Sequence, residues 1–600
     1  MSETPIEQVR RATRSVVGRL SRGRREASAD AAASSVPQVL SGLGLEVHDV
    51  VVIGGVGAVR LSNEVAAAAP QARVHLLRTQ SLSRGDQDEL AGNVSVSVCT
   101  TPDERADRLA ELPQPQMIID HAEWGTGGRL ACFKTTFLYL APGGAYLVRT
   151  DPVARPTSEQ DGADTALAVR QLLGRDGAHE GKLPHRRAEL AAATGDLAVQ
   201  DGELVVRKRL VHRYKLREAR ADGILRARYG QDWGEVVLTR PQETYRSAAT
   251  VTLHGAPQEW HGQADPPSRD AQVTVPPLSL RSYPSVRCWS YQRVARDNYW
   301  LPDTFRHPLD RYLMHRKLAS SNPRHARLPD EAANAKPTRR LTGSYYYFDS
   351  EYPGHFGHVI TETLGKVWGW HEARAVDPSV RPLFSLEPGM SELPAFEQQM
   401  LRAAGVDLNE VTYLAADESV DVETLYAASP GFVMPQYAAP HMGQVWGAVG
   451  SLGRPQEDYP RRLFVARRMA PLRSCENTAE VEDFFSSLGF TLVYPADHPL
   501  EEQIGMFQHA DVIAGFSGSG MFSMAFAPGK TVIVMAGDSF TATNEFLFSS
   551  VLGSRLHCFW GDSAVKHPPG KWAWKAYQSN FVFDVERFAP ELKEAVEDAG

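Results

Sequence analysis

The chain has 600 residues, of which 42% are hydrophobic, 9% aromatic and 23% charged. This composition excludes a collagen-like protein and a chain disordered over most of its length. Because one hydrophobic core cannot serve so long a chain, we expect about three or four domains. Lys and Arg total 64 against 72 Asp and Glu, a formal charge of −8. This mild acidity argues against a general nucleic-acid binder, which needs a basic surface.

Cysteine usage and hydropathy predict a cytoplasmic protein. The five cysteines are scattered and show no spacing typical of a metal site. No apolar run reaches the roughly 18 residues needed to span a bilayer. Residues 1–35 are rich in Arg and carry no apolar signal segment, so they predict a disordered tail. We therefore expect any membrane association to be at most peripheral.

Residues 36–155 alternate short apolar runs with helical segments. This alternation is typical of a parallel sheet covered by helices on both faces. The apolar runs predict strands at residues 50–53, 73–77, 116–120 and 145–148. The first predicted strand leads into a loop that contains Gly54, Gly55 and Gly57. The pattern predicts a Rossmann-like domain.

Three segments of this domain read VVVIGGVGAV, MIIDHAEW and LAPGGAYLVRTD. Through them it resembles the class I S-adenosylmethionine-dependent methyltransferases. The resemblance implies that Gly54, Gly55 and Gly57 let the backbone approach the cofactor, and that an acidic residue ending the second strand binds its ribose. Here Arg78 stands at that strand end. We therefore expect the fold without methyl transfer, and S-adenosylmethionine stays open as an alternative cofactor.

Residues 156–274 carry weaker patterns. A charged segment that predicts a helix is followed by a polar stretch interrupted by Pro and Gly. These patterns predict a connector that is helical and then β, to which the sequence assigns no role.

One segment of the C-terminal half reads SYYYFDSEYPGHFGHVITETLGKVWGW. Its aromatic run predicts a strand, its Pro and Gly residues predict a loop, and the remainder predicts a helix that ends at Trp370. In that helix His358 and Glu362 lie at positions i and i+4 and share one face. An imidazole and a carboxylate placed together can orient an acceptor hydroxyl and remove its proton. Either residue is therefore a candidate base.

A second cluster lies between residues 462 and 535, where strands and helices alternate again. The strand at 462–467 ends at Arg467, and Arg473 follows on the next loop. A later strand runs into a loop of small residues before a predicted helix at 521–527. Ligands of open α/β sheets bind at the carboxyl edge, where guanidinium groups and helix N-termini both hold phosphates. The predicted diphosphate cradle consists of Ser517, Gly518, Ser519 and Gly520.

These two blocks together resemble glycosyltransferase family 61. In the first block the matching residues are Gly357, His358, Glu362, Leu364 and Trp368. In the second block they are Arg467, Arg473, Asn477, Glu480, Gly489, Phe490, Glu502, Gln503, Ile504, Phe507, Gly515, Gly518 and Ser519. Ser517 stands where many family members have His. The match extends over roughly residues 275–536 in the family's order.

The resemblance implies an α/β fold of the GT-B type, with an acceptor lobe at 275–450 and a nucleotide-sugar lobe at 451–600. It implies inverting transfer from a nucleotide-sugar to a glycan or glycoconjugate, with no required metal or other cofactor. His358 and Glu362 are the implied catalytic residues. The implied donor-binding residues are Arg467, Arg473, Asn477, Gln503, Ser517, Gly518, Ser519 and Gly520. Trp368 and Trp370 are expected in the core.

Two other functions compete with this interpretation. A non-catalytic scaffold or glycan-binding protein is suggested by Arg78 and Ser517, which depart from the patterns of the two families. A bifunctional enzyme, whose first domain methylates the glycan that the second domain builds, is suggested by the glycine loop and opposed by Arg78.

Overall fold

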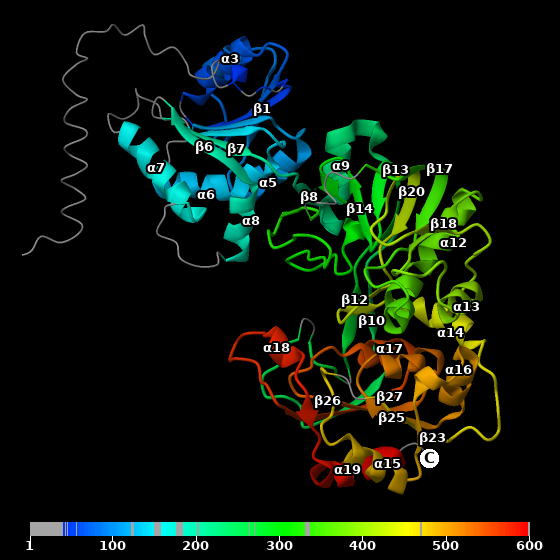
Figure 1. Cartoon of the computed structure of the whole chain (residues 1–600). Coiled ribbons are helices and arrows are strands. Elements are labelled where there is room, and N and C mark those ends of the chain that lie inside the picture. Colours follow the sequence, from blue (N-terminus) through cyan, green and yellow to red (C-terminus); the bar gives the residue numbers. More distant parts are fainter. Residues whose placement is uncertain are drawn as a thin grey trace, which may run out of the picture. The chain divides into compact units, whose positions relative to one another are not determined.

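The computed structural model describes residues 40–597 apart from positions 43, 45, 56, 122–124, 149–157, 176–183, 201–202, 263–264, 269, 330–335 and 469–470. The tail predicted for residues 1–35 lies outside the described residues. The chain divides into two compact units, Met1–Leu210 and Val211–Gly600, whose elements are labelled in Figure 1. Within the described part, no helix has the length and apolar character needed to cross a membrane.

The first unit is built on a seven-stranded sheet in the order β3-β2-β1-β4-β5-β7-β6. The first five strands are parallel, and β7 and β6 add two antiparallel strands beside β5. β1 is buried along its whole length, as the apolar run 50–53 of a strand between two helical layers must be. The strands are β1 (Asp49–Gly54), β2 (Arg73–Arg78), β3 (Val94–Val98), β4 (Met117–His121), β5 (Ala145–Val148), β6 (Thr194–Gln200) and β7 (Glu203–Lys208).

Helices cover this sheet and correspond to the predicted strand–helix alternation. The longer ones are α3 (Ala58–Ala68), α5 (Pro102–Glu111), α6 (Thr126–Thr136), α7 (Ser158–Leu172) and α8 (His185–Ala193). The sequence prediction of a Rossmann-like parallel sheet in this region is confirmed.

The connector expected at residues 156–274 is not a separate segment. Its first part supplies α7, α8, β6 and β7 to the first unit, and the rest supplies β8 (Arg213–Lys215), β9 (Glu235–Arg240) and β11 (Thr250–His254) to two sheets of the second unit. The sequence did not indicate these strands because they are short or lie at a sheet edge. In β11, for example, residues 250, 252 and 253 are exposed and residues 251 and 254 half-buried, an irregular pattern that hides its strand character.

The second unit contains a mixed ten-stranded sheet, here called the middle sheet, in the order β16-β8-β15-β14-β13-β20-β17-β18-β19, with β9 also paired to β13. Its central strands are β13 (Leu278–Trp289), β20 (Ser419–Ala428), β17 (Arg339–Tyr347) and β18 (Arg381–Ser385). The outer strands are β14 (Arg293–Arg296), β15 (Tyr299–Trp300), β16 (His325–Ala326) and β19 (Thr412–Leu414).

A second sheet of this unit, the C-terminal sheet, has seven strands in the order β11-β27-β26-β25-β23-β24, with β28 paired to β27. All pairs are parallel except β27–β28. Its other strands are β23 (Arg462–Val465), β24 (Thr491–Val493), β25 (Val512–Phe516), β26 (Thr531–Gly537), β27 (Arg555–Ser563) and β28 (Phe581–Val582). The helices around it are α15 (Thr478–Ser487), α16 (Leu500–His509), α17 (Asn544–Leu552) and α19 (Val585–Glu597), and the predicted helix at 521–527 is a 3-10 helix, η8 (Ser519–Phe526).

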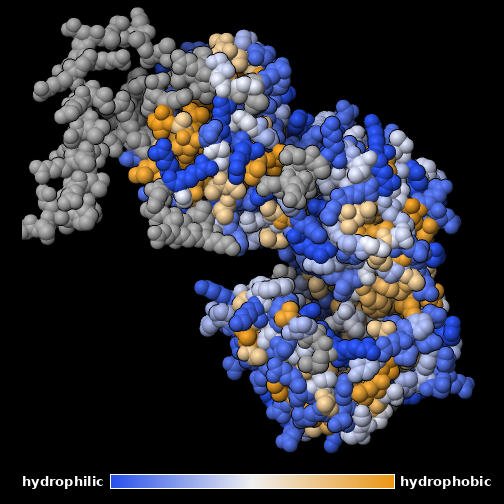
Figure 2. Space-filling model, viewed as in Figure 1, coloured by the Kyte–Doolittle hydropathy of each residue, from blue (hydrophilic) through white to orange (hydrophobic). Residues whose placement is uncertain are grey.

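One hydrophobic core joins the middle and C-terminal sheets. It extends from Leu280 and Tyr346 of the middle sheet to Val532 and Leu556 of the C-terminal sheet. Trp368 and Trp370 lie in this core, only 4% and 2% exposed, as the sequence predicts. On the face of the chain drawn in Figure 2, hydrophilic residues predominate and hydrophobic ones form separate patches.

Candidate active site

A cavity of about 240 Å³ in the second unit brings together most of the predicted site residues. From the predicted set it is lined by His358, Arg467, Arg473, Ser517, Gly518, Ser519 and Gly520. Lining residues that the sequence did not single out include His355, Asn544 and Tyr577. The predicted imidazole and the predicted guanidinium groups therefore share one cavity.

The predicted helix before Trp370 is an irregular run of helical turns. It consists of α11 (Phe356–His358), a π-helical turn over Val359–Thr363, a 3-10 turn over Leu364–Lys366 and α12 (Val367–Val376). π turns inside helices are frequent at functional sites. His358 and Glu362 still lie one above the other, because their side chains are hydrogen-bonded across this turn.

The His358 imidazole belongs to a buried charge network. Its Nδ1 lies 2.8 Å from Oε1 of Glu362, and Arg306 donates to the same carboxylate oxygen from NH2 at 2.6 Å and from Nε at 3.0 Å. Burial alone would raise the pKa of Glu362, but the Arg306 charge and then the His358 charge outweigh it and hold this pKa well below its ordinary value. Glu362 is thus an ionised carboxylate that is already bonded to Arg306 and His358, and its low pKa makes it a poor base.

This network distinguishes the two candidate bases that the sequence left open. With Nδ1–H donated to Glu362, the other ring nitrogen of His358, Nε2, is left as the acceptor. His358 lines the cavity, whereas Glu362 does not. The Tyr352 ring stacks on the imidazole at 4.4 Å between centroids and 10° between planes, which fixes the orientation of the imidazole. Arg306 was missed by sequence reasoning because no motif surrounds it.

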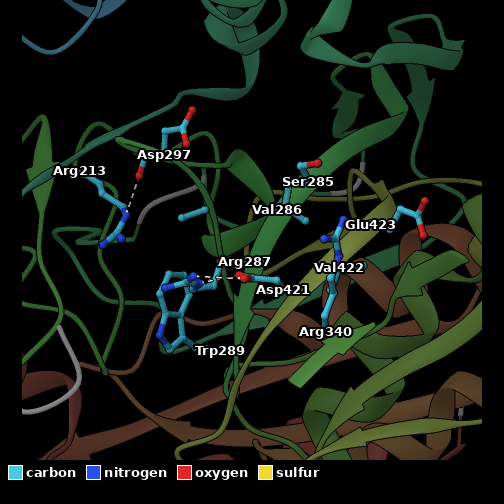
Figure 3. A pocket seen from close by; sticks show the side chains of 11 residues that line it. Arg213, Ser285, Val286, Arg287, Trp289, Asp297, Arg340, Asp421, Val422 and Glu423 are labelled. Atoms are coloured by element: carbon cyan, nitrogen blue, oxygen red, sulfur yellow. Dashed lines mark hydrogen bonds and ion pairs between the residues drawn. The ribbon is translucent and has the colours of Figure 1, made fainter. Parts of the chain in front are cut away.

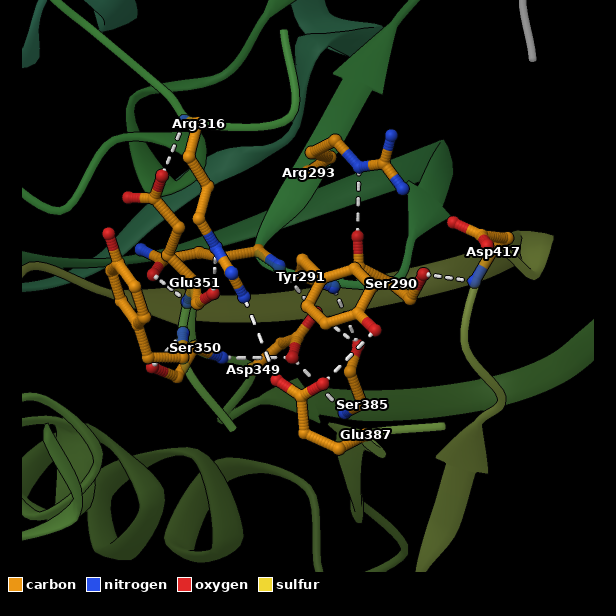
Figure 4. A network of polar contacts seen from close by, with 12 residues as sticks. Ser290, Tyr291, Arg293, Arg316, Asp349, Ser350, Glu351, Ser385, Glu387 and Asp417 are labelled. Carbon is orange, nitrogen blue, oxygen red and sulfur yellow. Dashed lines mark hydrogen bonds and ion pairs between the residues drawn. The ribbon is translucent and has the colours of Figure 1, made fainter. Parts of the chain in front are cut away.

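The loop before His358 is fastened by a second network, shown in Figure 4. Asp349 is fully buried and accepts hydrogen bonds from Gln292 N–H (2.7 Å), Ser350 N–H (2.9 Å), and both the N–H (3.1 Å) and the hydroxyl (2.7 Å) of Ser385. Gln292 and its neighbour Tyr291 have positive φ angles of 58° and 64°. Such strained residues persist where the surroundings over-determine them, as these bonds do.

Gly357 allows α11 to approach the serine–glycine loop. A Cβ atom on Gly357 would lie 2.9 Å from Cβ of Ser519 and 3.3 Å from the ring of Phe522. Any other residue would separate the two segments. The glycine before His358 is therefore a packing requirement that brings the imidazole beside the C-terminal sheet.

Arg467 and Arg473 form a cationic wall of the cavity. Neither makes an ion pair with a carboxylate of any described residue, and Arg467 donates from NH1 to the carbonyl of Arg473 at 3.3 Å. Burial and then the charge of Arg473 lower the pKa of Arg467. Arg473 also has a positive φ of 57° and a buried Nε without a partner. Two neighbouring guanidinium groups without a counter-ion are suited to hold an anion.

The serine–glycine loop is only partly free to bind a phosphate. The Ser517 hydroxyl (2.8 Å) and the Gly518 N–H (3.0 Å) both donate to Oε1 of Glu545. This overturns part of the predicted cradle, because a buried carboxylate already takes the donors of Ser517 and Gly518. Ser519 and Gly520 begin η8, where helix geometry leaves the first N–H groups without intrahelical partners. These two residues are the part of the cradle still open to a ligand.

Two predicted donor-binding residues lie outside this cavity. Asn477 bridges two chain segments: its Nδ2 donates to the Phe583 carbonyl at 2.7 Å and its Oδ1 accepts from the Phe583 N–H at 2.9 Å. The side chain of Asn477 therefore has a structural role, because both ends of its amide are bonded to Phe583. Gln503 lines an adjacent cavity of about 770 Å³ and donates to the His498 carbonyl. Arg467, Ser519 and Gly520 line both cavities.

The adjacent cavity is suited to an aromatic ring. Its wall includes the side chains of Phe356, Phe396, Tyr494, Pro499 and Leu500. It opens on the carboxyl ends of β23 and β24, the sheet edge at which parallel α/β sheets bind ligands.

Asn544 is a polar group of the first cavity without a strong partner. It is 5% exposed. Among the residues that the structure describes, its Oδ1 has no hydrogen-bond partner and its Nδ2 contacts only the sulfur of Met434, a weak acceptor. A buried amide left in this state costs free energy unless a ligand completes its bonds. No motif in the sequence marks this residue.

A third cavity, of about 430 Å³, contains none of the predicted residues. Figure 3 shows it on the middle sheet, with Arg287 paired to Asp421 at 2.7 Å and Arg213 donating to the Asp297 carbonyl at 2.9 Å. The Arg213 guanidinium lies over the rings of Trp289 and Trp300. These contacts engage Arg213, Arg287 and Asp421 within the fold.

In the glycine loop of the first unit, a Cβ on Gly54 would lie 2.7 Å from Cβ of Ala58, and Gly57 precedes α3 with a φ of 81°, so these two glycines serve packing and chain direction. Gly55 faces open space, so the loop itself does not oppose S-adenosylmethionine. At the end of β2, where a ribose-binding acid is needed, Arg78 has a buried Nε without a partner. An added cation there offers no acceptor to ribose hydroxyls.

Residues 356–534 match the family model described as Glycosyltransferase 61. This part of the chain is a glycosyltransferase 61 domain. The sequence-based resemblance is thus confirmed for this region, and the matched residues include His358, Arg467, Arg473 and the serine–glycine loop. A comparison with curated proteins gives no match.

Solved structures similar to the chain include two methyltransferases and one further cofactor-bound protein. MycE from the mycinamycin biosynthetic pathway is 16% identical, with a TM-score of 0.22, over 28% of this chain and 47% of that one. Human N-acetylserotonin methyltransferase is 15% identical, with a TM-score of 0.20, over 29% and 52%. Rv0187 from MTB, solved with its cofactor, is 20% identical, with a TM-score of 0.21, over 34% and 91%. The chain thus spans about half of the first two proteins.

Arg78 occupies the position where an acidic residue would bind the ribose of S-adenosylmethionine, and this gives a prediction for cofactor binding. S-adenosylmethionine at saturating concentration should leave the melting temperature of the full chain unchanged, whereas a ligand at 100 times its Kd stabilises by about 2.7 kcal/mol. Differential scanning fluorimetry measures this. The Arg78→Asp variant is the matched control, since it restores an acid to the strand end. A clear rise in melting temperature for the natural chain would contradict the prediction.

Glu397 gives a prediction for pH dependence. It lies in the first turn of α13 (Ala395–Ala403), is 2% exposed and accepts from the N–H of Gly354 in the loop before His358. Burial raises its pKa to about 8 from 4.5. The folded state therefore keeps a proton that the unfolded state has lost, and stability should fall by at most about 1.4 kcal/mol per pH unit between those values.

The matched variant is Glu397→Gln, which removes the titration and keeps the shape. Its melting temperature should decline less than that of the natural protein from pH 5 to pH 8. Parallel pH profiles of the two proteins would show that Glu397 does not titrate in this range.

Proposed function

We propose that the protein is an inverting glycosyltransferase that moves a sugar from a nucleoside diphosphate donor to a hydroxyl of a saccharide acceptor. The observation that carries the proposal is one cavity in which the His358–Glu362–Arg306 network meets two arginines without counter-ions. The glycosyltransferase 61 domain supplies the reaction class. The remaining details are drawn from the chemistry of the side chains.

In the proposed reaction, Nε2 of His358 takes the proton of the acceptor hydroxyl as its oxygen attacks the anomeric carbon. The bond from that carbon to the diphosphate oxygen breaks, and the diphosphate leaves with the electron pair. Glu362 holds the Nδ1–H of His358 and stabilises the imidazolium that forms, while Arg306 keeps Glu362 ionised. Attack from the face opposite the leaving group inverts the anomeric centre.

The negative charge of the departing diphosphate is assigned to Arg467, Arg473 and the free N–H groups of Ser519 and Gly520. Cationic and helix-terminal donors aimed at developing charge stabilise a transition state without reorganising. Among the described residues, no three His, Cys, Asp or Glu side chains are grouped so as to hold a metal ion. We assign no role to a metal.

The donor is proposed to extend through both cavities, since Arg467, Ser519 and Gly520 belong to each. With the diphosphate at these residues, the nucleoside occupies the larger, aromatic-lined cavity and the sugar lies toward His358. The unsatisfied amide of Asn544 is then available to hydroxyl groups of the sugar. This division corresponds to a GT-B arrangement of acceptor and donor lobes.

Arg467→Ala should weaken donor binding about 10- to 100-fold, because it removes a charge-assisted contact with the diphosphate. Isothermal titration with UDP-, GDP- and CDP-sugars identifies the donor and gives its Kd. The control is Arg462→Ala at the exposed start of the same strand, which should bind as the natural protein does. Absence of binding to every nucleotide-sugar, in folded protein, would favour the scaffold function.

His358→Ala should lower kcat about 10²- to 10⁴-fold while leaving the donor Kd unchanged, since it removes the base but not the groups that bind the diphosphate. The rate of nucleoside diphosphate release from the bound donor, with water as acceptor, measures this. His371→Ala, on α12 and hydrogen-bonded to Ala404, is the matched control. Equal rates for the two variants would exclude His358 as the base.

A further inference from the structure

The loop before β28 exposes two tryptophans. Trp572 and Trp574, in the segment KWAWK that ends in α18 (Trp574–Tyr577), are 49% and 63% exposed. Because tryptophan is highly buried on average, two neighbouring tryptophan rings that are exposed to solvent need an explanation. Their centroids lie 5.8 Å apart. Figure 1 shows α18 at the edge of the C-terminal sheet's region.

Contacts between aromatic rings connect the two exposed tryptophans to the candidate active site. Each of them lies 5.7 Å, between centroids, from the ring of Tyr577, which lies 5.0 Å from the ring of Phe540. Tyr577 and Phe540 line the same cavity as His358. Four aromatic rings thus lead from the surface to the catalytic cavity.

The loop that carries the tryptophans is held in place. Nε2 of His567 contacts the Ser539 carbonyl at 3.0 Å, its Nδ1 accepts from the Ala573 N–H at 3.0 Å, and the Gly570 N–H donates to Glu259 at 2.8 Å. Such bonds order the loop before any ligand arrives, which lowers the entropic cost of binding. The exposure of the rings is therefore built into the fold.

Two lysines flank the rings. Lys571 and Lys575 are exposed, and neither pairs with an acidic residue in the described part of the chain. The nearby Lys566, by contrast, is paired with Asp538 and Asp562. The free ammonium groups add an attraction for negative charge beside the aromatic surface.

We propose that Trp572, Trp574 and Tyr577 form a stacking platform for the acceptor, a saccharide chain that carries carboxylate or phosphate groups. Aromatic rings pack against the C–H face of a sugar, and Lys571 and Lys575 meet its charged groups. The chain end would then enter the cavity beside His358. This inference rests on the proposed function, because it identifies the acceptor of that same site.

A membrane surface is the other ligand that exposed Trp and Lys residues fit. The observations favour a saccharide, because the rings continue through Tyr577 and Phe540 to the cavity wall, whereas a bilayer would need only an outward patch. Membrane binding is therefore one of the outcomes of the test.

The test compares the full-length natural protein with the Trp572→Ala/Trp574→Ala double variant. Trigalacturonic acid is the acidic probe, cellotriose the neutral one, and phosphatidylglycerol vesicles the membrane probe. Saturation-transfer NMR should show trigalacturonic acid bound through its ring protons, about tenfold or more weakly by the double variant. Trp572→Phe/Trp574→Phe should retain binding, and Lys571→Gln/Lys575→Gln should weaken trigalacturonic acid more than cellotriose.

Three results would overturn the inference: no saccharide binds the natural protein, the Ala double variant binds as well as the natural protein, or only vesicle binding is lost. Donor titration of the same samples separates the two proposals. If nucleotide-sugars bind but the saccharide result is negative, the platform fails and the proposed function stands. If no nucleotide-sugar binds, the proposed function itself fails.

Discussion

The close contact between Gly357 and Ser519 is the constraint on which the candidate site depends. α11, which carries His358, comes after β17 of the middle sheet. The contact lets α11 lie directly against the loop that follows β25 of the C-terminal sheet. One hydrophobic core continues behind this contact and fixes the two sheets together. An imidazole and two guanidinium groups from distant parts of the sequence therefore face one small cavity, and the chemistry follows from that proximity.

Charge is distributed unevenly around this cavity. The two buried carboxylates next to it are already engaged, Glu362 by Arg306 and His358, and Glu545 by Ser517 and Gly518. Arg467 and Arg473, by contrast, form no ion pair with any acidic residue in the part of the chain that the structure describes. Because a partly buried cation without a partner is costly, a site of this kind gains most from an anionic ligand. The same reasoning separates His358, whose Nε2 is free, from Glu362, whose charge is fixed.

Sequence reasoning selected Arg467 from its place near a strand end and His358 from its helical spacing to Glu362. The structure places Arg467 two residues beyond the end of β23 and brings both residues to one cavity. Asn477 lies outside the cavity, and matching a motif does not reveal that its amide bonds to Phe583. Arg306, Glu545 and Asn544 were missed because each meets the site through a fold contact with no local pattern.

By itself, the sequence determined the α/β class, the glycine-rich turns and parallel strands such as β1, β2, β4 and β5, because these depend on local periodicity and on residue type. Only the tertiary structure decided which nitrogen of His358 is free, which loop donors Glu545 consumes, and that residues 156–274 are divided between the two units. These outcomes depend on contacts between segments far apart in the chain, and local patterns carry no information about such contacts.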